Sequence, residues 1–156
     1  LPMLLSHYKM LAWVGYQGAV QYPGVVIPTQ SDADKYPQYA SFHNTTYNAD
    51  RIMGEMSNAA SDGRNTGLAV HCGEFGCSKN VAEAMRLAWF TDMVAAMEAN
   101  NIPWTLWECL DGGFGFVDME YGIYRINCPL LKVLTGKELT DAEAKVLLQK
   151  YGFKTE

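Results

Sequence analysis

The sequence has no long apolar run and no cluster of basic residues. No stretch approaches the roughly 18 to 20 apolar residues that a membrane-spanning helix needs. The formal net charge is -5, and an acidic surface repels the phosphates of nucleic acids and of anionic lipids. Residues Leu1 to Leu5 lack the basic start and small-residue end of a signal peptide. We therefore expect a soluble chain, secreted or cytoplasmic, whose partners include neither nucleic acid nor membrane.

Cysteine is also scarce. The four cysteines, Cys72, Cys77, Cys109 and Cys128, form no CxxC pair, and four are too few for a disulfide scaffold in a chain of this length. His71 precedes Cys72 directly, but adjacent residues of a strand point to opposite faces, which does not suit a tetrahedral zinc site with Cys77. We expect no metal and no other cofactor.

The chain does have enough apolar residues for a core, at 49% of its 156 residues. Residues 68–75 form a mostly apolar run typical of a buried parallel strand. Asn80 and Glu83 resemble a capping box at the start of a helix that should stop at Asn100-Asn101, and residues 104–108 predict a second strand. This strand, helix and strand indicate a right-handed βαβ crossover.

Six further segments have weaker signals. Residues 4–8 could form a short strand, and residues 13–18 and 31–47 are expected to be loops. Helices are predicted from an Asn48 cap to Asp62-Gly63, from Pro129 to Gly136, and from a Thr140/Glu143 capping box to about Gly152.

Glu74 is the most conspicuous candidate for chemistry, because it ends an otherwise apolar strand. An α/β barrel places its catalytic side chains at such strand ends, although a strand-end acid can equally make a plain surface contact. Gly73 and Gly76 would let a substrate or an aromatic ring approach the backbone closely. His71 is three residues from Glu74 and should face away from it as a packed, hydrogen-bonded residue. His43, in a polar loop, is expected to be solvated.

Four segments together resemble glycoside hydrolase family 5 cellulases: Gly73-Glu74-Phe75-Gly76, a helix containing Arg86 and Trp89, the strand 102–108, and Gly113-Phe114-Gly115-Phe116-Val117-Asp118. They follow the order of that family's seventh and eighth strand units. The resemblance implies that Glu74 is the nucleophile of a retaining mechanism. It also implies that Trp107 is a platform for the sugar at the cleaved bond.

The amino-terminal stretch is similar to the family's sixth strand and the loop after it. His7 stands in place of a family histidine, and His7 and Tyr8 are expected near the substrate. Lys9 occupies the position of a tyrosine that hydrogen-bonds the nucleophile, and Tyr16 replaces a second histidine. The residues around Glu74 therefore depart from the family pattern.

The second carboxyl group of a retaining hydrolase has no obvious source. The family's Asn-Glu-Pro motif, whose glutamate is the general acid/base, does not occur, and a full (β/α)8 barrel takes about 250 residues. Retaining hydrolysis needs two carboxyl groups about 5 to 5.5 Å apart. Glu108 and Asp111 are the nearest possible acids, although acidic residues beside glycine turns are usually solvated.

Aromatic residues are frequent in the predicted loops. They could stack on sugar rings or pin the loops to the body of the fold; they are Tyr22, Tyr36, Tyr39, Phe42 and Tyr47. Trp89 and Met93 lie on the apolar stripe of the predicted helix and are expected in the core.

The sequence thus predicts an α/β fold: residues 1–156 as a single partial, half-like TIM barrel with parallel strands and flanking helices. Open edges favour completion by self-association, most simply as a homodimer. The leading interpretation is a β-glucanase segment that carries the nucleophile Glu74 and acts on a β-glucan or oligosaccharide. The alternative is a barrel remnant without catalytic activity that binds glycan or persists as a folded dimer.

Overall fold

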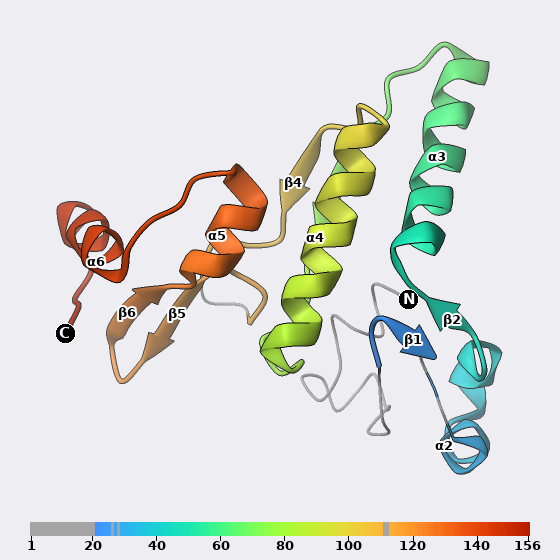
Figure 1. The fold of residues 1–156 in the computed structure, drawn as a ribbon, viewed down its shortest axis with the longest axis horizontal. Helices are drawn as coiled ribbons and strands as arrows, with labels where there is room; N and C mark the ends of the chain where they lie inside the picture. Colours follow the sequence, from blue (N-terminus) through green and yellow to red (C-terminus); the bar gives the residue numbers. More distant parts are fainter. Residues whose placement is uncertain (1–20, 26, 28, 111–112) are drawn as a thin grey trace.

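The computed structural model describes residues 21–25, 27, 29–110 and 113–156. In chain order the elements are β1 (Gly24–Val25), α2 (Gln30–Lys35), the 3-10 helix η2 (Pro37–Phe42), β2 (Thr46–Tyr47), α3 (Ala49–Thr66), β3 (Cys72–Phe75), α4 (Glu83–Ala99), β4 (Trp104–Leu106), β5 (Val117–Glu120), β6 (Ile123–Ile126), α5 (Cys128–Thr135) and α6 (Asp141–Lys150). The helices α3, α4 and α5 stand beside one another, with α6 at the far end (Figure 1). None of the described helices is long and apolar enough to cross a membrane.

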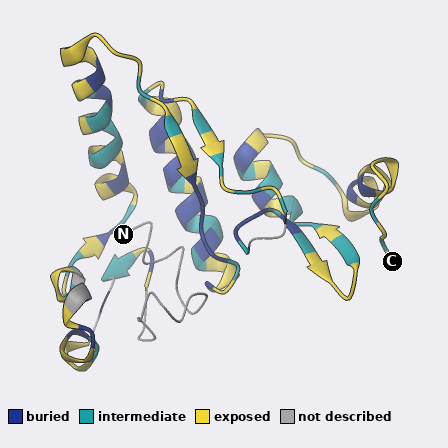
Figure 2. Cartoon of the chain, turned by 180° about the vertical axis from the view of Figure 1, so that it is seen from behind, coloured by how far each residue is buried: buried dark blue, intermediate teal, exposed yellow. Residues whose placement is uncertain are grey.

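The unit β3, α4, β4 confirms the predicted crossover. The two strands pair in parallel, Cys72 with Trp104 and Phe75 with Leu106. Helix α4 covers one face of the pair, and the opposite face carries mainly exposed residues (Figure 2). The described strands form three separate two-stranded sheets, so this part of the chain contains parallel α/β structure but no closed barrel.

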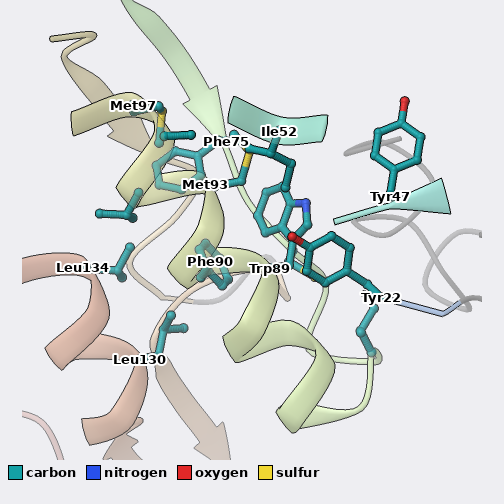
Figure 3. Close-up of a cluster of buried hydrophobic side chains, with 14 of the residues drawn as sticks. Tyr22, Tyr47, Ile52, Phe75, Trp89, Phe90, Met93, Met97, Leu130 and Leu134 are labelled. Atoms are coloured by element: carbon teal, nitrogen blue, oxygen red, sulfur yellow. The ribbon is translucent and has the colours of Figure 1, made fainter. Parts of the chain in front are cut away.

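Aromatic residues fill the space between the parallel strands and α4. The Phe75 ring lies 5.1 Å from that of Trp104, 5.7 Å from that of Phe90 and 6.2 Å from that of Trp89. Trp89 is fully buried and Met93 is 4% exposed, which confirms both as core residues (Figure 3). Tilted and edge-on ring contacts of this kind stabilise a core beyond the area they bury.

Local capping signals located most helix ends. The Asn48 side chain accepts from the Arg51 N–H, and α3 ends at Gly67 with φ 70°, a few residues beyond the predicted Asp62-Gly63. Gly136 ends α5 with the same φ, and the Thr140/Glu143 capping box is formed. The Asn80/Glu83 box was wrong, because α4 begins at Glu83 and its cap, Ala82, has no side-chain oxygen.

Two segments differ from the sequence prediction. Residues 31–47 are not a plain extended loop, since Thr29 caps α2 and η2 and β2 follow. The antiparallel hairpin of β5 and β6 was not predicted. Its turn places Tyr121 and Gly122 at φ 51° and 76°, the positive values that tight hairpin turns require.

The first predicted strand, residues 4–8, and the loop 13–18 lie outside the described residues. The strand predicted over residues 68–75 is shorter than expected and begins at Cys72. Its first half contains Leu68, which is 71% exposed, so an apolar run here does not mark a buried strand.

Candidate functional site

Glu74 and Trp107 lie at the carboxyl ends of the paired strands β3 and β4. The Trp107 N–H donates to the Phe75 carbonyl over 2.8 Å, which places Trp107 beside the residue that follows Glu74. Glu74 is exposed and Trp107 is 53% exposed. A carboxylate and a flat aromatic ring are therefore both accessible at one end of the parallel pair.

An irregularity in β3 changes which residues share a face. Three steps along β3, from Cys72 to Phe75, match two steps along β4, and both side chains belong to the core between the strands and α4. In a regular strand they would point to opposite faces. An extra residue of this kind is a β-bulge, and bulges re-aim side chains next to active sites.

His71 is affected by the same irregularity. Its Nε2 lies 3.3 Å from Thr105 Oγ1, so the expected hydrogen bond is present. The expectation of a packed histidine was wrong, because His71 is exposed. The sequence argument placed His71 and Glu74 on opposite faces because they are three residues apart in a regular strand. The irregularity lies between them, since Cys72 and Phe75 both face the core, so this argument no longer holds.

The two glycines beside Glu74 have different roles. A Cβ built on Gly76 would lie 2.2 Å from the Trp107 carbonyl oxygen, so only glycine allows this close approach of the two strand ends. A Cβ on Gly73 would meet no described atom within 4 Å. The expected close approach is thus found at Gly76, and its partner is the backbone of Trp107.

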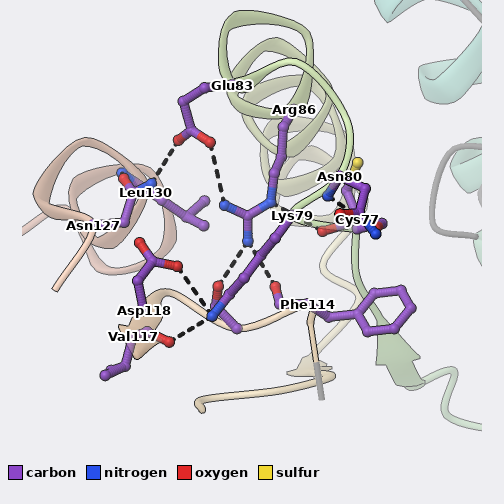
Figure 4. A network of polar contacts seen from close by, with 12 residues as sticks. Cys77, Lys79, Asn80, Glu83, Arg86, Phe114, Val117, Asp118, Asn127 and Leu130 are labelled. Carbon is purple, nitrogen blue, oxygen red and sulfur yellow. Dashed lines mark hydrogen bonds and ion pairs between the residues drawn. The ribbon is translucent and has the colours of Figure 1, made fainter. Parts of the chain in front are cut away.

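Buried polar contacts join the loops that follow β3 and β4 (Figure 4). Arg86 of α4, 1% exposed, donates from Nε to the Cys77 carbonyl and from Nη2 to the carbonyls of Phe114 and Gly115. Lys79 Nζ donates to the Val117 carbonyl at 2.6 Å.

Nζ of Lys79 also lies 3.0 Å from Asp118 Oδ1. Sequence reasoning used Arg86 only as part of a motif and missed Lys79. An arginine on the apolar stripe of a helix was the available signal, since a buried charge needs partners.

Glu108 follows Trp107 and is half-buried. Its Oε1 is enclosed and has no hydrogen-bond partner among the described residues. The pKa of the neighbouring Cys109 thiol is raised, first by partial burial and then by the negative charge of Glu108. Asp111, the other possible acid, lies outside the described residues, as do His7 and Tyr8.

The loop aromatics that can be placed are buried. Tyr22 is 4% exposed, Tyr36 is 8% and Tyr47 is 5%, and the Tyr22 hydroxyl donates to Asp92 on α4. These three pin the loops to the body and are not free to stack on a sugar. The side chains of Tyr39 and Phe42 lie outside the described part of the structure.

Two further sequence expectations concern His43 and the cysteines. His43 is not simply solvated, because its Nδ1 lies 2.9 Å from the Ile27 carbonyl. All four cysteines are free thiols. Among the described residues no three His, Cys, Asp or Glu side chains gather as they would around a metal ion.

Comparison with protein-family models identifies this chain. Residues 21–113 match the model of the cellulases, glycosyl hydrolase family 5. The chain belongs to this family. The matched segment includes β3, α4 and β4, and therefore contains both Glu74 and Trp107.

Solved structures show the same fold relationship. The Clostridial cellulose synthase subunit Z from Clostridioides difficile matches with a TM-score of 0.58 and 18% identity, over 84% of this chain and 36% of that one. Thermotoga maritima Cel5A in complex with mannotriose matches with a TM-score of 0.57 and 20% identity, over 85% and 36%. This chain spans about a third of each of these structures. A search of curated proteins found no match.

Proposed function

We propose that this chain is the nucleophile-bearing segment of a retaining β-glucanase of family 5, with Glu74 as nucleophile and Trp107 as sugar platform. The placement of an exposed carboxylate and an exposed indole on neighbouring parallel strand ends supports this most directly. The family match over the same strands supports the substrate class. We further propose that residues 1–156 form one partial barrel domain, with His7 and Tyr8 at the same substrate site.

In this mechanism a Glu74 oxygen attacks the anomeric carbon and the glycosidic bond breaks, which forms a glycosyl-enzyme intermediate. The leaving oxygen takes up a proton, and water later releases the sugar. The proton donor would be a second carboxyl group about 5 to 5.5 Å from the first. Within this chain the proposed candidates are Glu108 and Asp111, and in an assembled barrel another chain or segment would supply it.

A second function is favoured by one observation. Among the described residues, the Glu74 carboxylate takes part in no hydrogen bond or ion pair, and a nucleophile is normally oriented by neighbouring groups. The alternative is therefore a barrel segment without catalytic activity that still binds β-glucan through Trp107. Stacking on a sugar face needs no second carboxylate.

Hydrolysis of an aryl β-glucoside separates these two functions. Its activated leaving group needs little protonation, so a working nucleophile shows itself even without the acid. Glu74→Gln should abolish the reaction, because the amide keeps the size and loses the nucleophilic oxygen. The matched control is Glu98→Gln, which replaces an exposed carboxylate near the C-terminal end of α4. This variant should remain active. Equal activity of Glu74→Gln would remove Glu74 from the mechanism.

Binding is tested independently with cello-oligosaccharides. Tryptophan fluorescence of the wild type should change on titration, and the change should be lost in Trp107→Ala. The control is Trp104→Phe, which removes a half-buried indole on the helix-facing side of β4. If neither the wild type nor the control responds, both glucan-based functions fail.

We also propose that the chain self-associates. In the described part of the chain, the face of β3 and β4 away from α4 carries mainly exposed residues, and each strand of this pair has a single partner. Exposed strand edges and apolar side chains such as Trp107 favour pairing with a second chain. Sedimentation at micromolar concentration should give a species heavier than 17.4 kDa, and a clean monomer would contradict this proposal.

A further inference from the structure

Arg86 is the one charged side chain buried among the described residues. Its guanidinium donates to three carbonyls, at 3.0 Å to Cys77 and at 2.7 Å to each of Phe114 and Gly115. Cys77 belongs to the loop after β3, and the other two belong to the loop after β4. The guanidinium of arginine spreads five donors over three nitrogens in a fixed planar fork, whereas a lysine ammonium carries its three donors on a single nitrogen.

The segment that carries Trp107 is the start of the loop after β4, and it is packed on both sides. The Trp107 carbonyl lies against Gly76, and the Cys109 carbonyl lies against Gly115, where an added Cβ would be only 2.3 Å away. The Cys109 carbonyl also accepts from the Val117 N–H at 3.0 Å. Residues 107–109, at the start of the loop after β4, are thus held between Gly76 and the later part of their own loop, which are the two segments that Arg86 joins.

Glu83 extends the network beyond α4. Its carboxylate lies 3.5 Å from Arg86 Nη1 and accepts from Asn127 Nδ2 at 2.6 Å. Asn127 caps α5 and donates from its backbone to the Phe116 carbonyl. The guanidinium is therefore oriented from one side by Glu83 while it holds the loops on the other (Figure 4).

From these contacts we infer that Arg86 is a positioning residue for Trp107. It fixes the loop after Glu74 to the loop after Trp107, and so sets where the indole stands relative to the end of β3. Arg86 itself is buried beneath both loops and does not reach a ligand. The consequence for glucan binding rests on the proposed function. The contacts by which Arg86 locks the two loops are independent of that function.

Amide hydrogen exchange tests the locking directly in Arg86→Lys. The N–H groups of Lys79, Trp107 and Val117 donate to the carbonyls of Gly113, Phe75 and Cys109. They should exchange about tenfold faster or more, because several charge-assisted hydrogen bonds that hold these segments together are lost. Amides in the middle of α3 should change less than about twofold, since α3 makes none of these contacts. Arg51→Lys, an exposed ion-pair residue of α3, is the control and should leave the three loop amides unchanged.

Chemical rescue gives a second, independent measurement. In Arg86→Ala, millimolar ethylguanidinium should restore part of the protection of the three loop amides, and it should not do so in Arg51→Ala. If Arg86→Lys fails to fold, Glu83→Gln keeps the arginine and loosens its orientation, and the same three amides should be affected most. Uniform acceleration throughout the chain, or no change at the loops, would overturn the inference.

The link to binding is measured with cello-oligosaccharides. Arg86→Lys should bind at least about fivefold more weakly than wild type, because the indole stands in a different place. Unchanged affinity despite loosened loops would overturn the positioning role. If the wild type binds no oligosaccharide, the proposed function fails, and the exchange and rescue results still decide whether Arg86 locks the loops.

Discussion

Replacing Gly76 with alanine should destabilise the chain and displace Trp107. The added Cβ would lie 2.2 Å from the Trp107 carbonyl oxygen, 3.3 Å from its carbonyl carbon and 3.2 Å from the Phe114 ring. The first contact is with backbone, which cannot rotate away as a flexible side chain would. Overpacking of this kind costs about 1–3 kcal/mol.

Gly73→Ala, three residues earlier and inside β3, is a matched control. No described atom lies within 4 Å of its added Cβ. Where a glycine has a backbone conformation that alanine can also adopt, replacing it with alanine raises the free energy of unfolding by about 0.4–1 kcal/mol, because the unfolded chain loses conformational entropy. The two variants should therefore change stability in opposite directions, although the substitution is chemically the same.

Urea denaturation followed by far-UV circular dichroism measures both free energies of unfolding. Fluorescence of Trp107 should also shift in Gly76→Ala and not in Gly73→Ala. Equal stability of the two variants would show that the strand ends are not in the close contact described above.

Two other predictions concern titratable groups. Hydrogen bonds from the Thr140 backbone and hydroxyl lower the pKa of Glu143 below its usual 4.5. This carboxylate therefore stabilises α6 above that pH, and the effect is lost as the pH falls through the lowered pKa. NMR chemical shifts should show that the start of α6 frays on acidification, and this pH dependence should be absent in Glu143→Gln. Burial raises the pKa of the Cys77 thiol to about 12, so at pH 8 a thiol reagent should modify the exposed Cys109 in the folded chain and reach Cys77 only after denaturation. Modification of Cys77 at the rate of Cys109 would contradict its burial.

Local sequence signals determined several helix ends and the crossover. Asn48, Gly136 and the Thr140/Glu143 pair were recognisable because a cap needs only a side chain and the backbone within the next few residues. The apolar stripe of α4 likewise identified Trp89 and Met93 as core. The family motif added the strand order and the candidates Glu74 and Trp107, since all its residues lie within two consecutive strand units.

Only the tertiary structure decided features that depend on residues distant in sequence. The extra residue in β3 undid the alternation argument for His71, because register is set by pairing with β4 and by packing on α4. The loop aromatics could either stack on sugars or pin the loops, and the sequence favoured neither. The burial of Tyr22 and Tyr47 shows that these two pin the loops. Arg86 acquired its partners only when the loops after β3 and β4 met. An arginine on the apolar stripe of a helix indicates from the sequence that hydrogen-bond acceptors must lie nearby. Only the folded chain brings the carbonyls of Cys77, Phe114 and Gly115 within its reach.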